Sequence, residues 1–195
     1  MDQATITSAA LEALEEGGFE KLSMRAVAAR LGVHVGGLYY HVADRAALMR
    51  TMSDVLCARA LDDLAPTGPW RTDAAALCHG VRRSILACRD GARLLAASPM
   101  VGSVEALRLM ERLMSTLAGG LPAAQVPAAA DTLMSYVTGF VLQEQLEASA
   151  GGPDRGMSET DLAKRFPWVF EGVTQPSSDA TFAAGVEAIL RGFAP

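Results

Sequence analysis

The sequence predicts an all-α protein, and two observations carry this prediction. Ala, Leu, Met, Glu and Arg, which favour helices, dominate almost every segment, with Gly and Pro between them at intervals. No alternating pattern of useful length indicates a strand. The chain of 195 residues is 50% hydrophobic and 20% charged, which is typical of a folded protein with a sizeable core. We therefore expect two parts. The first is an N-terminal module of three helices that contains a helix-turn-helix, and the second is a larger helical body.

The N-terminal helices are delimited by glycine and by capping residues. The first helix is expected over about residues 5–16 and ends at Gly17 and Gly18, because glycine takes a left-handed turn at low cost. Ser23 is placed to cap a second helix over residues 24–31, since its hydroxyl can accept a hydrogen bond from a free amide.

A turn at Gly32 leads into a short third helix over residues 35–41. Asp44 then opens a long helix, which ends in the Pro- and Gly-containing stretch 65–69. The inward stripe of this long helix is apolar and consists of Leu48, Met52, Val55 and Leu56.

The stretch 65–69 separates the small N-terminal module from the helical body. The helices of the body are expected at about residues 72–88, 92–97, 104–117, 127–148, 159–170 and 179–192.

The stretch 22–48 has the pattern of a helix, a tight glycine turn and a second helix. Its apolar residues are expected to be buried, namely Val27, Ala28 and Leu31 from the first helix and Val33, Leu38 and Val42 from the second. The second helix is then short and exposed along one side, as a helix that reads the major groove must be.

The exposed side of this short helix is expected to present Val35, Gly36, Gly37, Tyr39, Tyr40 and His41. Arg25 and Arg45 lie near the two ends of the stretch 22–48 and complete the candidate DNA-binding set. Tyr, His and Arg side chains donate hydrogen bonds to phosphate oxygens, and paired glycines let a helix approach DNA closely. Arg25 is the best candidate for a bidentate contact with guanine. The alternative is that Tyr39 and Tyr40 are core aromatics and that Arg25 and Arg45 belong to a solvated face.

Charge along the chain is uneven. The formal net charge is −5 at pH 7, which by itself argues against DNA binding. Between residues 25 and 50, however, Asp44 is the only acid, and the stretch carries +3. The basic residues of this cationic spot are Arg25, Arg30, Arg45 and Arg50.

The stretch 22–48 resembles the DNA-binding module of the Tet-repressor family, in which L-x-x-R-x-x-A-x-x-L-G-V leads to G-x-L-Y-x-H. The matching residues are Leu22, Arg25, Ala28, Leu31, Gly32, Val33, Leu38, Tyr39, His41, Asp44, Ala47 and Leu48. The resemblance implies double-stranded DNA as a partner. It implies phosphate contacts from Tyr39, Tyr40 and His41, and groove contacts from Arg25, Val35, Gly36 and Gly37.

The body resembles the regulatory domain of the Tet repressor in two runs, residues 89–93 and 138–145. The resemblance aligns six residues with ligand contacts: Leu61, Leu77, Val81, Leu95, Met110 and Gln143. Leu95 replaces the histidine that holds magnesium, and magnesium needs oxygen and water ligands in octahedral geometry, so we expect that tetracycline–magnesium is not the effector.

A largely apolar effector is expected instead. The candidates for its polar contacts are Arg82, Arg89, Thr138 and Gln143. For each of these ligand-site residues taken alone, packing in the core is an equally good explanation.

Two helices near the C-terminus carry strongly apolar stripes, and the family pattern is a four-helix bundle of two such helices per subunit. The stripes are Leu133, Tyr136, Val137, Phe140 and Val141, and Phe182, Val186, Ile189, Leu190 and Phe193. We therefore expect a homodimer that holds its two reading helices roughly 34–36 Å apart on a palindromic operator.

Other classes of protein find little support. The chain has three cysteines and three histidines without metal-ligand spacing, so we expect free, mostly buried thiols, no metal and no cofactor. No Ser/His/Asp set or phosphate-binding loop indicates an enzyme. Without a signal peptide or a membrane-spanning run, a cytoplasmic protein is expected.

The sequence thus predicts a ligand-responsive transcriptional regulator, with repression as the family default. By function, we assign residues 1–47 to a helix-turn-helix DNA-binding domain and residues 48–195 to a ligand-binding and dimerisation domain. The alternative is a helical small-molecule-binding protein without a DNA role, and the cationic stretch 25–50 argues against it.

Overall fold

The computed structural model describes residues 1–62, 68–98, 102–149, 157–174 and 179–193, and every regular element in these ranges is a helix. The N-terminal elements are α1 (Gln3–Gly17), the 3-10 helix η1 (Phe19–Lys21), α2 (Met24–Arg30), α3 (Val35–Tyr39) and α4 (Arg45–Asp62). The body consists of α5 (Trp70–Leu86), α6 (Gly91–Ala96), α7 (Val104–Ala118), α8 (Val126–Ser149), α9 (Glu159–Arg165), α10 (Pro167–Thr174) and α11 (Asp179–Gly192). The all-α prediction is confirmed.

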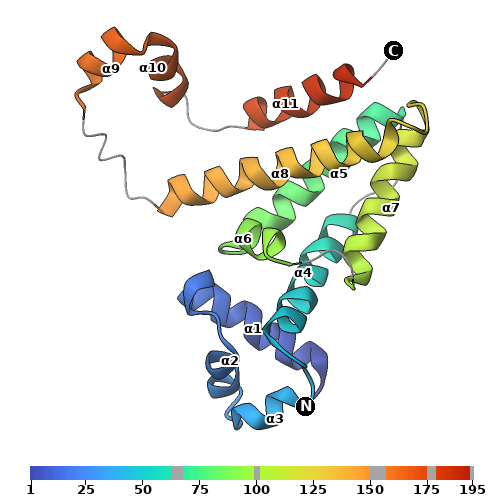
Figure 1. Ribbon diagram of the computed structural model, residues 1–195, viewed down its shortest axis with the longest axis vertical. Coiled ribbons are helices and arrows are strands. Elements are labelled where there is room, and N and C mark those ends of the chain that lie inside the picture. Colours follow the sequence, from blue (N-terminus) through green and yellow to red (C-terminus); the bar gives the residue numbers. More distant parts are fainter. Residues whose placement is uncertain (63–67, 99–101, 150–156, 175–178, 194–195) are drawn as a thin grey trace.

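The N-terminal module lies at one end of the molecule, where α1 packs against both α2 and α4, and α2 packs against α3 (Figure 1). Five of its large apolar side chains are fully buried: Ile6, Leu14, Leu38, Leu48 and Met52. Each such burial stabilises the fold by about 1.5–3 kcal/mol. The short α3 is therefore held on a core that the neighbouring helices supply.

The module's helix ends follow the expected capping chemistry. The Ser23 hydroxyl accepts a hydrogen bond from the Ala26 amide at 3.2 Å and so caps α2. After α1, Gly18 takes a φ of 74°, and Gly32 takes a φ of 66° in the turn between α2 and α3, where a side chain would strain the backbone. The Asp44 carboxylate accepts a hydrogen bond from an α4 amide at 2.6 Å.

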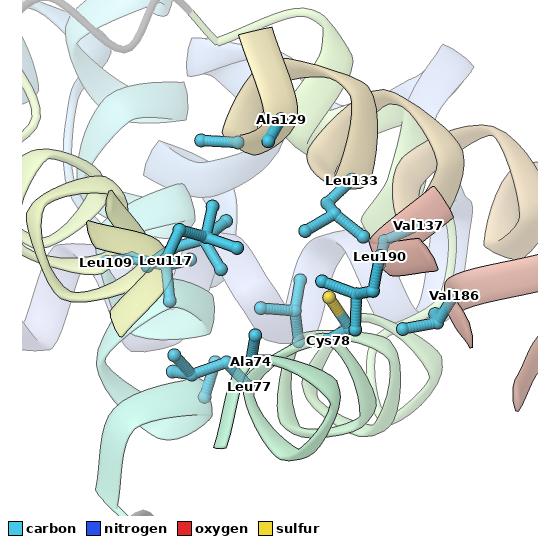
Figure 2. Packing of buried hydrophobic residues seen from close by; sticks show 14 of the residues in the cluster. Ala74, Leu77, Cys78, Leu109, Leu117, Ala129, Leu133, Val137, Val186 and Leu190 are labelled. Atoms are coloured by element: carbon cyan, nitrogen blue, oxygen red, sulfur yellow. The ribbon is translucent and has the colours of Figure 1, made fainter. Parts of the chain in front are cut away.

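A second buried cluster holds the body together, and Figure 2 shows how side chains from several helices point into it. Leu77 comes from α5, Leu117 from α7, Leu133 and Val137 from α8, and Leu190 from α11. All of them are buried. The body is thus a helical bundle with a core of its own.

The helix α4 takes part in both clusters. Leu56 packs in the cluster of the N-terminal module, whereas Cys57 and Ala60 pack in the cluster of the body. The functional division after residue 47 falls in the first turn of α4, and this assignment stays a prediction. One helix therefore contributes side chains to both cores.

The expectation of a single helix over residues 159–170 was wrong. The helix α9 ends at Arg165, and Phe166 leaves helical geometry, with φ −140° and ψ 63°, before Pro167 begins α10. Proline lacks an amide hydrogen and disfavours helical geometry in the residue before it. Figure 1 shows α9 and α10 set apart from the bundle. Of the break expected at 65–69, residues 65–67 lie outside the described residues, and Gly68 and Pro69 precede the start of α5.

The apolar stripes of α8 and α11, which were expected to face a second subunit, are largely used within this one. Phe182, Val186 and Leu190 are buried against α5 and α8, and Leu133 and Val137 are fully buried too. This corrects the residues assigned to the interface. The outward faces of the two helices carry small residues instead, among them Thr132, Ser135 and Gly139 on α8 and Ala184 and Ala188 on α11.

Candidate DNA-reading helix and ligand cavity

The helix α3 buries one side and exposes the other. Leu38 and, just after the helix, Val42 are buried, together with Val27 of α2. Leu31 is only half-buried, and Val33, which was expected in the core, is 37% exposed in the turn, so that expectation was wrong. The reason is geometric, because Val33 lies outside both helices and turns away from the side that they share.

The outward side of α3 carries most of the residues expected to contact DNA. Tyr40 is 89% exposed and Tyr39 is 50% exposed, so neither is a core aromatic. The other exposed members of the predicted set are Gly36, Gly37, His41, Arg25 and Arg45. Val35 differs from the rest, because it is half-buried and packs against the core of the module.

A residue that sequence reasoning missed fixes the start of α3. The Nδ1 atom of His34 accepts a hydrogen bond from the Gly36 amide at 3.1 Å, so the imidazole serves as the helix N-cap. Histidine is not among the residues usually preferred at this position, which explains why no sequence signal pointed to it.

The cationic spot is smaller than the sequence suggested. Arg30 donates to Glu12 at 2.8 Å and to Glu16 at 2.6 and 2.7 Å. These bonds raise the pKa of Arg30 and lower the pKa of Glu16. Helix packing brings α1 onto α2, so acids of α1 neutralise the charge of Arg30. The local charge of +3, which was counted over residues 25–50 alone, is therefore too high.

Arg45 is also engaged within the module. Its guanidinium lies 5.3 Å from the centre of the Phe19 ring and its Nε donates to the Leu22 carbonyl at 3.4 Å. Arg25 is exposed in the first turn of α2. Both arginines are exposed, as the sequence predicted.

The body contains a cavity of about 190 Å³ between α4, α5, α6, α7 and α8. Its described lining is mostly apolar and consists of Ser53, Leu56, Cys57, Ala60, Val81, Ile85, Leu95, Ala96, Ser98, Ser103, Ala106, Leu109, Met110, Met134 and Thr138. Burial raises the pKa of the Cys57 thiol to about 12, so this group is neutral at physiological pH. All three cysteines are free and buried, as expected.

The cavity brings together some of the predicted ligand-site residues and leaves out others. Those that line it are Val81, Leu95, Met110 and Thr138. Leu77 is buried in the body's core, Leu61 packs against that core, and Gln143 is exposed on α8. Arg82 and Arg89 also lie outside the lining, and each makes contacts of a different kind.

Arg82 joins three helices of the body. It donates to Glu144 at 2.6 and 2.9 Å and to Asp179 at 2.5 Å, which lowers the pKa of Asp179. Its guanidinium also lies 4.9 Å from the centre of the Phe182 ring. Arg82 and Glu144 are largely buried, so removing either of them leaves the charge of the other uncompensated. Arg82 therefore has a structural position linking α5, α8 and α11.

Arg89 connects the body to the N-terminal module. Its guanidinium donates to the carbonyls of Glu15 and Glu16 at the end of α1, at 3.0 and 3.1 Å. The neighbouring Asp90 accepts a hydrogen bond from the Phe19 amide at 2.8 Å. We call Arg89 and Asp90, with these partners, the clasp. The sequence offered no signal for it beyond the run 89–93, because its partners lie more than seventy residues away.

An exposed reading helix on a small helix-turn-helix module, joined by α4 to a helical body with an internal cavity, defines a ligand-responsive helix-turn-helix regulator. The family comparisons agree. Residues 6–52 match the model for bacterial regulatory proteins of the tetR family, and residues 64–195 match that for the tetracyclin repressor-like C-terminal domain. The chain belongs to the tetR family of DNA-binding transcriptional regulators.

Individual relatives cover nearly the whole chain. The class A tetracycline repressor protein from transposon 1721 of Escherichia coli is 28% identical over 194 residues, which are 97% of this chain and 89% of that protein. A crystal structure of a possible TetR family transcriptional regulator from Streptomyces coelicolor A3(2) is 28% identical, with a TM-score of 0.86 and 98% of both chains covered.

Two further structures were solved with bound partners. ActR of Streptomyces coelicolor in complex with (S)-DNPA has 27% identity and a TM-score of 0.81, over 99% of this chain and 96% of that one. BioQ with its double-stranded DNA operator has 27% identity and a TM-score of 0.75, over 99% of this chain and 98% of that one.

Proposed function

We propose that this protein is a cytoplasmic, homodimeric repressor that binds a palindromic operator and leaves it when a small, largely apolar effector enters the body. The observation that carries the proposal is the outward side of α3, where exposed tyrosines and paired glycines stand on a helix whose other side is buried. Among the described helices, none combines the length and apolar character needed to cross a membrane.

The surface of α3 fits a major groove. Gly37 has open space where a side chain would stand, so the backbone of α3 can approach base edges closely. Tyr39, Tyr40 and His41 can then donate to phosphates, while Arg25 reaches a guanine from the start of α2. The likeness to BioQ, which was solved with its operator, supports this reading.

The cavity supports a small-molecule effector. Its described lining holds no charged side chain, and Leu95 is among its apolar walls. Within the described part of the chain, no group of three or more His, Cys, Asp or Glu could hold a metal ion. We therefore propose that tetracycline–magnesium is not the effector, although relatives of this chain are tetracycline repressors. For the same reasons we propose no catalytic activity.

The helix α4 can couple the cavity to α3. Leu56, Cys57 and Ala60 line the cavity, while Leu48 and Met52 of the same helix pack in the core beneath α3. An effector that prefers a tilted α4 shifts the population toward a state in which the two reading helices no longer match successive major grooves. A coupling free energy of about 1–3 kcal/mol between the two sites is usual.

A mobility-shift titration on the DNA that flanks its own gene tests the proposal. Arg25→Ala should weaken binding by about 5–150-fold, because a good bidentate base contact contributes roughly 1–3 kcal/mol. Tyr40→Ala should also weaken binding, through the loss of a phosphate contact. Tyr40 makes few packing contacts, so its loss should not disturb the fold. Arg83→Ala, at an exposed arginine of α5, is the matched control and should bind normally.

The same titration decides against the alternative of a helical ligand-binding protein without a DNA role. A repressor that neutralises phosphates loses affinity steeply as salt rises. If both variants bind like the wild type, or if the salt dependence is flat, the assignment of α3 and α2 to DNA is wrong.

A further inference from the structure

We propose that the effector is an uncharged compound, about the size of one substituted ring, whose hydroxyl or carbonyl oxygen bonds to the buried hydroxyls of Ser53 and Ser98. This inference rests on the proposed function, since it names the chemical class that the cavity of the body accepts. Three features of that cavity support the inference: its unpaired polar atoms, the lack of charged side chains in its described lining, and its size.

The cavity wall contains two hydroxyls without a partner. The Oγ atoms of Ser53 and Ser98 are both buried, and neither makes a hydrogen bond within the described part of the chain. Ser53 is only 1% exposed and lies in the middle of α4, where a serine usually bonds to the carbonyl one turn earlier. Buried hydroxyls are rarely left unpaired, so these two point to a polar ligand group.

Other hydroxyls near the cavity are already in use. Ser84 donates to the Leu56 carbonyl at 2.7 Å, and Ser103 donates to Asp54, which also accepts from the Glu105 amide. The carboxylate of Asp54 is thus occupied at the start of α7. Apart from Thr138, Ser53 and Ser98 are the hydroxyls of the described lining that remain for a ligand.

The ligand has to be neutral. The described lining contains no acid, no base and no aromatic ring, and the Cys57 thiol stays protonated at physiological pH. An ion buried against apolar side chains without a counter-ion is strongly unfavourable. The space of about 190 Å³ is slightly larger than a cavity of roughly 150 Å³ that holds benzene in another protein, so one ring with a short polar substituent fits.

The lining can adapt to such a compound. Met110 and Met134 face the cavity from α7 and α8, and their unbranched side chains fill irregular gaps with little strain. Ser53 lies one residue from Met52, which is fully buried in the core of the N-terminal module. A hydrogen bond from the effector to Ser53 therefore acts on α4, the helix whose tilt is proposed to release the protein from its operator.

The test uses full-length protein and three probes of similar size: 2-phenylethanol, ethylbenzene and phenylacetate. Calorimetric titration should show binding of 2-phenylethanol, and Ser53→Ala should weaken it by about 3–10-fold, the value of one hydrogen bond. The same variant should leave ethylbenzene, which has no oxygen, unchanged. Phenylacetate, which is an anion, should not bind.

Two controls separate ligand binding from folding. Ser53→Ala removes an unpaired hydroxyl, so the melting temperature of the free protein should stay the same or rise. Ser84→Ala breaks the bond to the Leu56 carbonyl, so it should lower the melting temperature while keeping the preference between 2-phenylethanol and ethylbenzene.

The outcomes distinguish this inference from the proposed function. It is overturned if neither neutral probe binds, if phenylacetate binds as well as the alcohol, or if Ser53→Ala weakens both neutral probes equally or neither. Operator binding without any probe is measured in parallel. If the wild type does not bind the operator, the proposed function is overturned. If the wild type binds the operator but does not distinguish the probes as expected, only the ligand class is overturned.

Discussion

Single residues account for most of the differences between the expected and the observed surface around α3. Arg30 was counted as part of a cationic spot, but Glu12 and Glu16 neutralise it across the α1–α2 contact. Val33 was expected inside and is exposed, while Val35 was expected outside and is half-buried. In a segment of only about two helical turns, side-chain direction depends on where each turn begins, and a pattern of apolar residues defines that start poorly.

The paired glycines of α3 provide a test at this scale. A side chain added at Gly37 meets no atom within 4 Å, so Gly37→Glu should fold normally. Its carboxylate would stand in the groove against phosphates, and operator affinity measured by fluorescence anisotropy should fall at least about tenfold.

Gly172→Glu is the matched control for this variant. Gly172 also lies in a helix with open space around it, but on α10, far from α3 in Figure 1. Circular dichroism should show an intact fold for both variants. Wild-type affinity for Gly37→Glu would mean that α3 does not face the DNA.

At the scale of elements, the module and the body are joined by more than α4. The clasp ties the turn between α5 and α6 to the end of α1, and Arg93 adds an ion pair with Glu20 at 2.5 Å. On the other side of this turn, Gln145 of α8 donates to the Cys88 carbonyl at 2.7 Å. The turn next to the cavity helix α6 is therefore fastened to both parts of the molecule.

Removing the clasp should loosen that connection. Arg89→Ala deletes the donors to two carbonyls at the end of α1, which should cost about 1 kcal/mol and lower the melting temperature by roughly 2–4 °C in a chain of this size. Differential scanning calorimetry measures the shift. Arg83→Ala removes a comparable exposed arginine on α5 and should melt like the wild type. Equal melting of both variants would show that the clasp contributes nothing to stability.

For the whole molecule, the decisive observation is that α8 and α11 pack their apolar stripes inside the subunit. Phe182 and Leu133 are fully buried without a partner chain. What these helices present outward is a face of small residues, including Ser135 and Gly139 on α8 and Ala184 on α11. Small residues let helix backbones approach closely, so these faces support the proposed four-helix interface between two subunits.

A large charged side chain on that face should separate the subunits. A side chain at Gly139 meets no atom of its own subunit within 4 Å, so Gly139→Arg should fold but sediment as a monomer. Operator affinity should fall by at least about a hundredfold, because a single subunit reaches only one half-site. Ala123→Arg, on an exposed turn before α8, is the control. A dimeric Gly139→Arg protein would place the interface elsewhere.

The sequence by itself determined the helical class, the caps at Ser23 and Asp44, and the reading helix, because these depend on neighbouring residues and on local periodicity. It also led to four of the residues that line the cavity. Only the tertiary structure decided which charges are neutralised, which apolar stripe is internal, and which hydroxyls stay unpaired. The clasp and the pairing of Arg82 with Asp179 join residues more than seventy positions apart, and no local pattern encodes such contacts.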